Sequence, residues 1–264
     1  MPEGPEVKIV TEWLIKYCSG CTIKNNDKFP EINSYVIQRI ECKGKHIFFH
    51  LFNTADQTRK VLESHLAMTG RWSHIQGNHT RFWMVLSNPI VLQDWILYFD
   101  DVRKWGRISL LSTDEFVNKI DQIGPDLLSD VINPGEWHRK IKNGRIKNKM
   151  ICDYLLEQKH FSGIGNYLKS DILYLCKIKP DRPLCSLSDE EINCLLQVSV
   201  STIKESYSYG GLTIKNFWDP EGKRGLYPTK VYNKVCDCNG YKIVKIKFKG
   251  NNDRTTHWVP EVQK

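Results

Sequence analysis

The sequence of 264 residues predicts an α+β protein in which a β-rich part precedes a helical part and a terminal hairpin. Short apolar runs separated by Gly, Asn, Asp and Pro occupy residues 35–111, as in a β-sandwich or open barrel. Apolar residues at helical spacing dominate residues 151–203. Asn239-Gly240, a strong hairpin-turn signal, separates two strand-like runs near the C-terminus.

Composition restricts the class of protein and its compartment. The hydrophobic fraction of 41% and the charged fraction of 26% are ordinary for a globular protein, and the net charge of +8 suits a polyanionic partner without proving one. The start carries Glu3 and Glu6 in place of an apolar signal segment, and no apolar run approaches the ~18 residues of a membrane span. Nine scattered cysteines indicate reduced thiols. We therefore expect an intracellular protein, in the nucleus or the cytoplasm.

The first part of the chain is expected to combine one helix with several strands. Apolar residues at helical spacing begin it, namely Val7, Val10, Leu14 and Tyr17. The strand-like runs that follow are Tyr35–Ile40, Ile47–Leu51, Phe82–Leu86, Ile96–Phe99 and Ile108–Leu111. Gly124-Pro125-Asp126 marks the expected end of this domain, which we place at residues 1–125.

The second part is expected to be helical, over residues 126–225. The helical pattern begins at Ile151, and Ser188-Asp189-Glu190-Glu191 is a capping-box start for a later helix. One face of that later helix carries Ile192, Leu195, Leu196, Ser199 and Ile203. A linker at residues 210–228 leads to a final module at 226–264. Its expected strands are Val231–Val235, Ile243–Phe248 and Thr255–Val259, with a turn at residues 250–253.

The first six residues, Met1-Pro2-Glu3-Gly4-Pro5-Glu6, carry a candidate nucleophile. Removal of Met1 would leave Pro2 with a free secondary amine, and an α-amino pKa near ~8 keeps a fraction of it unprotonated at neutral pH. Such an amine can attack an electrophilic sugar carbon and form a Schiff base. Glu3 follows directly and can act as general acid or base. An idle, frayed terminus is the structural alternative.

Four internal motifs accompany this terminus. Lys43-Gly44-Lys45 precedes a strand-like run, and Gly163-Ile164-Gly165-Asn166-Tyr167-Leu168 follows a helical one. His65-Leu66-Ala67-Met68-Thr69-Gly70 and Asp101-Val102-Arg103-Lys104-Trp105-Gly106 have the composition of loops. Each motif also has a purely structural interpretation. A lysine before a strand can be solvated, a Met in a loop can serve core packing, and an Arg beside a Trp can form a cation–π contact.

In this order the motifs resemble those of the formamidopyrimidine-DNA glycosylase/endonuclease VIII family, and the resemblance covers essentially the whole chain. The two loops are similar to the family's His-Leu-Gly-Met-Ser-Gly and Asp-Pro-Arg-Arg-Phe-Gly. The resemblance implies that the Gly163 motif is the second turn of a helix–two-turns–helix. Asn166 would then lie near a helix N-terminus, where free N–H groups favour a phosphate.

The resemblance also assigns roles to single residues. Lys45, with Lys43 as the fallback, would contact the phosphate next to the lesion and assist catalysis. Met68, Arg103 and Trp105 would fill the gap left by a flipped base. Extruding a base from the duplex costs a few kcal/mol, and filling the gap offsets part of that cost. The remaining matches are one supporting carboxylate and two DNA-contacting side chains: Glu6, His79 and Lys147. A solvated charge is the alternative for each basic residue.

The C-terminus departs from the four-cysteine zinc finger of the family. Cys236-Asp237-Cys238 has a one-residue gap, and Val259 and Val262 replace the second pair. Two thiolates do not complete a tetrahedral structural zinc site, even with His257 as a candidate third ligand. The chain thus resembles the zincless-finger branch, in which a C-terminal β-hairpin alone presents Arg254, within Arg-Thr-Thr-His-Trp, to the DNA phosphates. No cofactor is implied.

The function implied is a bifunctional DNA glycosylase/AP lyase of base excision repair. Pro2 would attack C1′ of the sugar while Glu3 assists by proton transfer, and the Schiff base would permit β- and δ-elimination. Lys45, Asn166 and Arg254 would hold the phosphates. The expected partner is double-stranded DNA carrying oxidised bases or abasic sites, bound by a monomer. The alternatives are a catalytically silent damaged-DNA-binding homologue and a monofunctional glycosylase.

The preferred lesion, the opposite base and the balance of β- and δ-elimination are open at this stage. Cys152 stands where some formamidopyrimidine-type members have a lysine, which weakens a strict 8-oxoguanine assignment. The linker at residues 210–228 is long enough to close over a flipped purine and favours some purine-derived activity.

Overall fold

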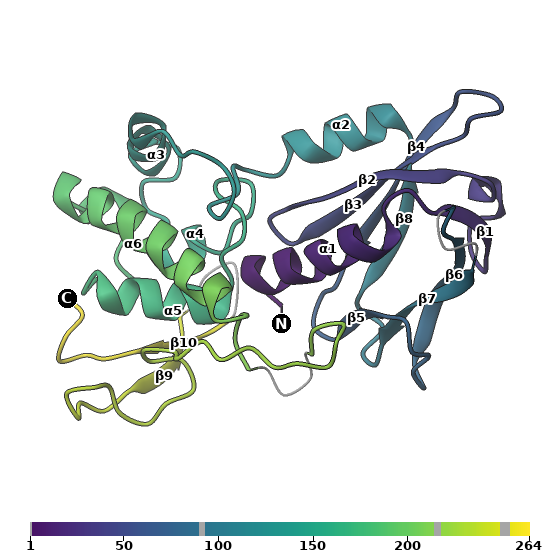
Figure 1. The fold of residues 1–264 in the computed structure, drawn as a ribbon. Coiled ribbons are helices and arrows are strands. Elements are labelled where there is room, and N and C mark those ends of the chain that lie inside the picture. Colours follow the sequence, from purple (N-terminus) through teal and green to yellow (C-terminus); the bar gives the residue numbers. More distant parts are fainter. Residues whose placement is uncertain (1, 90–92, 214–217, 249–253) are drawn as a thin grey trace. The chain divides into compact units, whose positions relative to one another are not determined.

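The computed structural model describes residues 2–89, 93–213, 218–248 and 254–264 (Figure 1). The chain forms two compact units. The first contains the chain up to Gln122 together with Thr213–Leu226, and the second contains Ile123–Leu212 and Tyr227–Lys264. Among the described helices, none has the length and apolar character to span a membrane. The division into three domains at residues 125 and 225 stays a prediction.

An eight-stranded antiparallel sheet forms most of the first unit, with strand order β5-β7-β6-β1-β2-β3-β4-β8. Its strands are β1 Thr22–Asn26, β2 Val36–Lys43, β3 His46–Phe52, β4 Arg59–His65, β5 Gly70–Ser73, β6 Thr80–Ser87, β7 Asp94–Asp101 and β8 Arg107–Leu111. The helical elements of this unit are α1 Gly4–Cys18, η1 Pro30–Ile32 and α2 Thr113–Asp121. Four of the five expected strands lie within β3, β6, β7 and β8, and the expected Tyr35–Ile40 overlaps β2, which begins one residue later at Val36.

The sheet folds over on itself to make the expected sandwich. The Trp72 indole of β5 packs against the Phe49 ring of β3 with centroids 5.4 Å apart, although four strands separate β5 from β3 in the sheet order. The Trp72 Nε1–H also donates to Ser64 Oγ of β4 at 3.0 Å. Apolar side chains of both halves form one buried core, which includes Phe82 and Phe99.

Helix α1 contains the residues whose spacing predicts a helix, begins at Gly4 and packs against β2 (Figure 1). Pro5 lies in its first turn, where a missing N–H leaves no helical hydrogen bond unmade. Val7, Val10 and Leu14 are buried in the core as their spacing indicates. Tyr17, the last residue of that predicted face, is 40% exposed.

The second unit is mainly helical. Its helices are α3 Pro134–Ile141, α4 Ile151–Tyr154, α5 Asn166–Leu175, η2 Leu184–Ser186 and α6 Asp189–Ser208. The predicted capping box at Ser188 is present, with the Glu191 N–H donating to Ser188 Oγ at 3.2 Å. Helices α5 and α6 pack together over a core that includes Trp137, Leu168 and Ile192.

The C-terminal hairpin differs from the prediction in one strand. Strands β9 Val244–Lys247 and β10 Thr255–Trp258 pair in antiparallel register, and the predicted turn at residues 250–253 lies outside the described residues. Val231–Val235, predicted as a strand, instead forms turns and bends. The buried Asp171 carboxylate explains this, because it accepts the N–H groups of residues 230, 231 and 232 and curls the segment around itself.

Candidate active site

The N-terminus is fixed by two buried carboxylates. Glu3 and Glu6 are 2% and 0% exposed and form a capping box at the start of α1. In it the Glu6 carboxylate accepts the Glu3 N–H at 2.7 Å. Pro2 is also buried. The Glu6 carboxylate therefore fixes the backbone from which Pro2 and Glu3 project, and its supporting role in the reaction stays a prediction.

The tight turn between β2 and β3 carries the two candidate lysines. Lys43 pairs with His46 across the hairpin, so Gly44 and Lys45 form its two-residue turn, in which Gly44 adopts φ +58°. The Lys43 Nζ donates to the Ile120 carbonyl at 3.4 Å. Lys45 is 7% exposed, which is unlike a solvated lysine. The two lysines thus differ in their surroundings, and the choice of Lys45 over the fallback Lys43 stays a prediction.

His65, at the end of β4, has no individual role in the sequence prediction. Burial, together with the nearby charges of His46 and Lys45, lowers the pKa of His65 to about 3. Its Nδ1 accepts the Ala67 N–H at 3.2 Å, as a neutral imidazole allows. His65 thereby orders the start of the loop that contains Met68.

The loop with Met68 and the loop with Arg103 and Trp105 are joined through Asp101. The Asp101 carboxylate accepts the Thr69 hydroxyl of the first loop and two N–H groups of the second, from Arg103 at 3.2 Å and from Gly106 at 2.6 Å. The Arg103 N–H also donates to Thr69 Oγ1 at 3.0 Å. The two loops predicted to replace a flipped base are thus held side by side.

The side chains on these loops differ in exposure. Trp105 is 59% exposed, and the Arg103 guanidinium lies over its ring, 5.4 Å from the centroid. Met68 is half-buried. His79 is exposed, and its carbonyl accepts the Asp101 N–H at 3.0 Å, so it lies beside the same two loops. Four of the predicted DNA-contacting residues therefore share one region of the first unit.

In the second unit, Asn166 and Arg254 come together although 88 positions separate them. Both line a pocket of about 430 Å³ that also includes Lys245 and His257. Asn166 is the first residue of α5, and its Nδ2 donates to the Thr255 carbonyl at 2.9 Å. Arg254, exposed, directly precedes β10. Lys147 is exposed between α3 and α4 and does not line this pocket.

A buried lysine that the sequence prediction missed supports Asn166. Lys169 is 1% exposed, and its Nζ donates to Asn166 Oδ1 at 2.9 Å and to Thr256 Oγ1 at 2.8 Å. The ammonium accordingly fixes which side of the Asn166 amide is the acceptor, and it ties α5 to β10 next to Arg254. Its position at i+3 from Asn166 on a helix is the sequence signal that could have indicated it.

Apolar side chains, those of Val259 and Val262, stand at the two positions where a zinc finger of the family would have its second cysteine pair. Val259 is fully buried and packs with Tyr174, Val231 and Ile243, with Val262 at the edge of the cluster. His257 is buried, and burial with the nearby Lys245 and Lys169 lowers its pKa to about 4. Cys236 and Cys238 are exposed. Within the described ranges, no three His, Cys, Asp or Glu side chains are grouped so that they could hold a metal ion.

Comparisons with known proteins agree with this arrangement. The model of the formamidopyrimidine-DNA glycosylase N-terminal domain matches residues 1–108, and that of the formamidopyrimidine-DNA glycosylase H2TH domain matches residues 123–217. A formamidopyrimidine-DNA glycosylase of Listeria innocua is 30% identical over 289 residues and covers all of both chains. One from Exiguobacterium sp. is 29% identical over 290 residues, covering 100% of this chain and 99% of its own.

Solved structures of similar fold include complexes with DNA. A mutant FPG of Lactococcus lactis bound to DNA containing Fapy-dG superposes with a TM-score of 0.86, at 26% identity and full coverage of both chains. The Lactococcus lactis Fpg with abasic-site DNA gives a TM-score of 0.85 at 26% identity, covering 99% of each chain. The likeness therefore extends over both units of the chain.

Proposed function

Because the chain belongs to the formamidopyrimidine-DNA glycosylase family, we propose that it excises oxidised bases from DNA and cleaves the resulting abasic site as a lyase. The observation that carries this proposal is the start of α1, where Pro2 adjoins the buried Glu3. There the Glu6 carboxylate accepts the Glu3 N–H at 2.7 Å and holds the backbone of this segment. A proline amine with a neighbouring carboxyl group supplies both the nucleophile and the proton donor that the reaction needs.

The chemistry proceeds from the Pro2 nitrogen, which becomes a secondary amine once Met1 is removed. Its lone pair attacks C1′, the bond from C1′ to the base breaks, and the base leaves with the electron pair of that bond. Glu3 transfers protons as the sugar ring opens and an iminium ion forms between Pro2 and C1′. The iminium acidifies C2′–H, so the 3′-phosphate leaves by β-elimination and the 5′-phosphate by δ-elimination. Water then releases the sugar fragment and restores the amine.

Phosphates are held by residues from both units. In the second unit Asn166, at the N-terminus of α5, lines the same pocket as Arg254. The Asn166 amide and the Arg254 guanidinium, which can donate two hydrogen bonds, together suit a backbone phosphate. In the first unit Lys45 supplies a cation from a tight turn. Lys147 adds an exposed positive charge in the second unit.

The two loops joined by Asp101 replace the flipped nucleotide. Met68 provides an apolar wedge, Arg103 faces the partner base, and Trp105 stacks beside it. The contact of Arg103 with the Trp105 ring supports a common orientation before DNA binds. His79, beside these loops, contacts the backbone of the duplex.

Support for the substrate class comes from the related complexes. The Lactococcus lactis proteins are bound to DNA containing Fapy-dG or an abasic site. By analogy we assign duplex DNA with oxidised bases or abasic sites to this chain, and a zincless finger to β9 and β10, where an apolar cluster includes Val259.

The test is reductive trapping on duplex DNA with one abasic site. With Met1 removed, borohydride should link the protein to DNA, and peptide mapping should place the link at Pro2. Glu3→Gln, which keeps the amine, should lose excision of an intact lesion far more than trapping on the abasic site. A link to a lysine, or equal activity of a form that retains Met1, would overturn the Pro2 assignment. Base release without nicking would identify a monofunctional glycosylase, and duplex binding without either reaction a silent homologue.

A further inference from the structure

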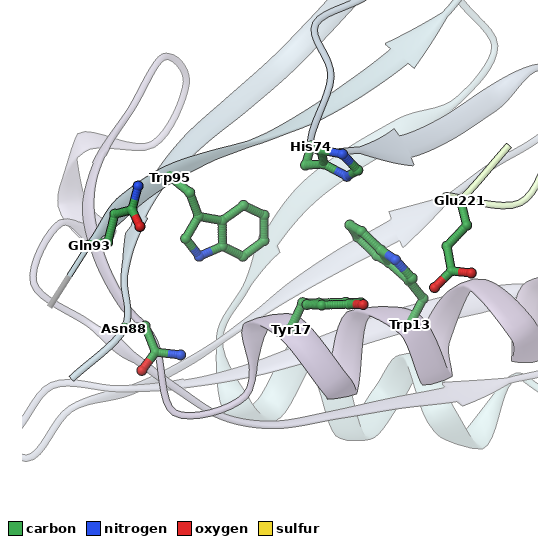
Figure 2. A pocket seen from close by; sticks show the side chains of 7 residues that line it. All are labelled: Trp13, Tyr17, His74, Asn88, Gln93, Trp95 and Glu221. Atoms are coloured by element: carbon green, nitrogen blue, oxygen red, sulfur yellow. The ribbon is translucent and has the colours of Figure 1, made fainter. Parts of the chain in front are cut away.

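A pocket in the first unit is lined by aromatic rings (Figure 2). Pro2, Glu3 and Glu6 do not line it. Its volume is about 420 Å³, within the range of small-molecule sites. The rings are those of Trp13, Tyr17, His74 and Trp95. They come from three elements, namely α1, the loop after β5, and β7. None of these residues takes part in the function proposed above.

The rings form walls around an open centre. Trp13 and Tyr17, one helical turn apart on α1, are in contact with centroids 5.0 Å apart, and His74 stacks near Trp13 at 6.2 Å and 22°. Trp95 makes no ring contact with the other three within the described part of the chain. Figure 2 shows its indole across the pocket from Trp13, with His74 above and Tyr17 below the space that separates them. The space between the two indoles is therefore open for a flat ligand.

Two carboxamides lie at the Trp95 side of this space, those of Asn88 and Gln93 (Figure 2). A carboxamide offers a donor and an acceptor together, which is the pattern that pairs with the edge of a nucleobase. Aromatic side chains that stack on a base and amides that meet its edge are the usual means of recognising an unpaired base.

We propose that this pocket binds a nucleobase, stacked between Trp13 and Trp95 with its polar edge toward Asn88 and Gln93. An aromatic cage can also hold a methylated ammonium, for which a free carboxylate would be needed. Glu221 is the carboxylate in the lining, and it pairs with Lys223 at 2.9 Å. Lys16 lies over the Tyr17 ring at 4.7 Å, so a positive charge already occupies that wall. These cations disfavour a cationic ligand and suit the phosphate of a nucleotide.

The base can come from a free nucleotide or from a DNA strand, and the chemistry of the pocket is the same for both. The proposal does not depend on the proposed lyase chemistry, because Trp13 lies ten residues after Glu3 on α1, about 15 Å along the helix axis. Binding at the pocket and nicking at Pro2 are consequently separable measurements.

The experiment follows the indole N–H signals of Trp13 and Trp95 by NMR in protein with ¹⁵N-labelled tryptophan, during titration with dGMP. Both signals should shift and saturate. Tyr17→Leu removes the aromatic wall that contacts Trp13 beside the stacked base and should weaken binding by about 5-fold or more, which corresponds to ~1 kcal/mol, the lower end for a base–aromatic contact. His74→Ala should act in the same direction. Tyr241→Leu replaces a tyrosine of similar exposure outside the pocket, 46% against 40%, and should leave binding unchanged.

Two further titrations distinguish a DNA strand from a free nucleotide as the source of the base and test whether the pocket binds a cationic ligand. A single-stranded tetranucleotide that binds more tightly than dGMP assigns the pocket to a DNA strand, and equal binding assigns it to a free nucleotide. Tetramethylammonium should cause no shift. The proposal is overturned if dGMP shifts neither indole at millimolar concentration, if Tyr17→Leu and Tyr241→Leu behave alike, or if tetramethylammonium binds and Glu221→Gln abolishes that binding. Nicking of abasic DNA should be the same in Tyr17→Leu and wild type, whatever the outcome for dGMP.

Discussion

His65 shows how one buried side chain couples loop order to pH. Its imidazole accepts the Ala67 N–H at the start of the Met68 loop, and its pKa of about 3 lies below the ~6.5 of an unfolded chain. The unfolded chain therefore binds a proton that the folded chain excludes between these two values. The free energy of unfolding should fall as pH falls through this window, by up to about 1.4 kcal/mol per pH unit.

His65→Asn tests this, because an amide oxygen can accept the same N–H without titrating. Between pH 7 and pH 5 the wild type should lose about 2 kcal/mol more unfolding free energy than the variant, measured by urea denaturation. His79→Asn, at an exposed histidine, is the control and should follow the wild type. Parallel profiles for His65→Asn and wild type would contradict the assignment of this pH dependence to His65.

The proposed role of Arg254 depends on the shape of its side chain, because a planar guanidinium can bind one phosphate through two hydrogen bonds. In Arg254→Ala, Pro2 and Glu3 are unchanged, so an abasic site should still be nicked by β-elimination. Excision of an intact lesion should fall about tenfold or more, as expected for loss of a charge-assisted hydrogen bond, and δ-products should decrease. End-labelled DNA on a gel separates the β and δ ends.

Arg254→Lys keeps the charge without the planar fork and should recover only part of the δ-product. An unchanged ratio of products and an unchanged excision rate in Arg254→Ala would show that this arginine is merely solvated surface.

The residues of the candidate site differ in how far sequence could predict them. Pro2, Glu3 and Glu6 adjoin in the chain, so their proximity was predictable. Asn166 and Arg254 meet through packing of α5 on β10, which no spacing rule conveys. Asp101 and Lys169 act by tying other groups together, and a carboxylate or lysine with that role looks like any solvated charge in the sequence.

At the scale of elements, strands rich in aromatic and β-branched residues were predictable and weaker ones were not. β1 is Thr-Ile-Lys-Asn-Asn and β5 has four residues, so neither shows a sustained alternation. β4 pairs on both sides, with β3 and β8, which its mixed polar sequence does not indicate. Helix α2 was missed, although Ser112 and Glu115 form a capping box that a search for that pattern would find.

The hairpin of β9 and β10 yields a prediction about metal. Val259 is buried with Tyr174 and Ile243, so apolar contacts occupy the place that thiolates have in a zinc finger. Chelator should leave the melting temperature unchanged, and elemental analysis should find far less than one zinc per chain. Val259→Ala should lower the free energy of unfolding by about 2 kcal/mol, because it opens a cavity in that cluster. One zinc per chain, lost with a drop in melting temperature, would contradict this.

At the scale of the whole molecule, the order of a β-rich part and a helical part was predictable from two different hydrophobic periods. The grouping of Thr213–Leu226 with the first unit was not, because this segment has no strong periodicity and joins that unit only through tertiary contacts. Glu221, which lines the aromatic pocket with Trp13, shows the consequence: a feature built from distant segments has no local signature.

The net charge of +8 belongs to the molecule as a whole and leads to a prediction about salt. Each phosphate that a cation neutralises releases condensed counterions, so the logarithm of affinity for undamaged duplex should fall linearly with the logarithm of salt concentration. If three cations, namely Lys45, Lys147 and Arg254, each neutralise one phosphate, the slope should be about −2.7. Lys147→Gln should make the slope shallower by about 0.9.

A matched control in the same unit is Lys159→Gln, since Lys159 is exposed but pairs with Glu157 at 3.4 Å. Its slope should equal that of the wild type. Fluorescence anisotropy with a labelled duplex, at salt concentrations from 50 to 300 mM, gives each slope directly. A slope near zero would mean that affinity does not arise from phosphate contacts. Equal slopes for Lys147→Gln and Lys159→Gln would remove Lys147 from the interface while leaving the electrostatic account of the remaining cations in place.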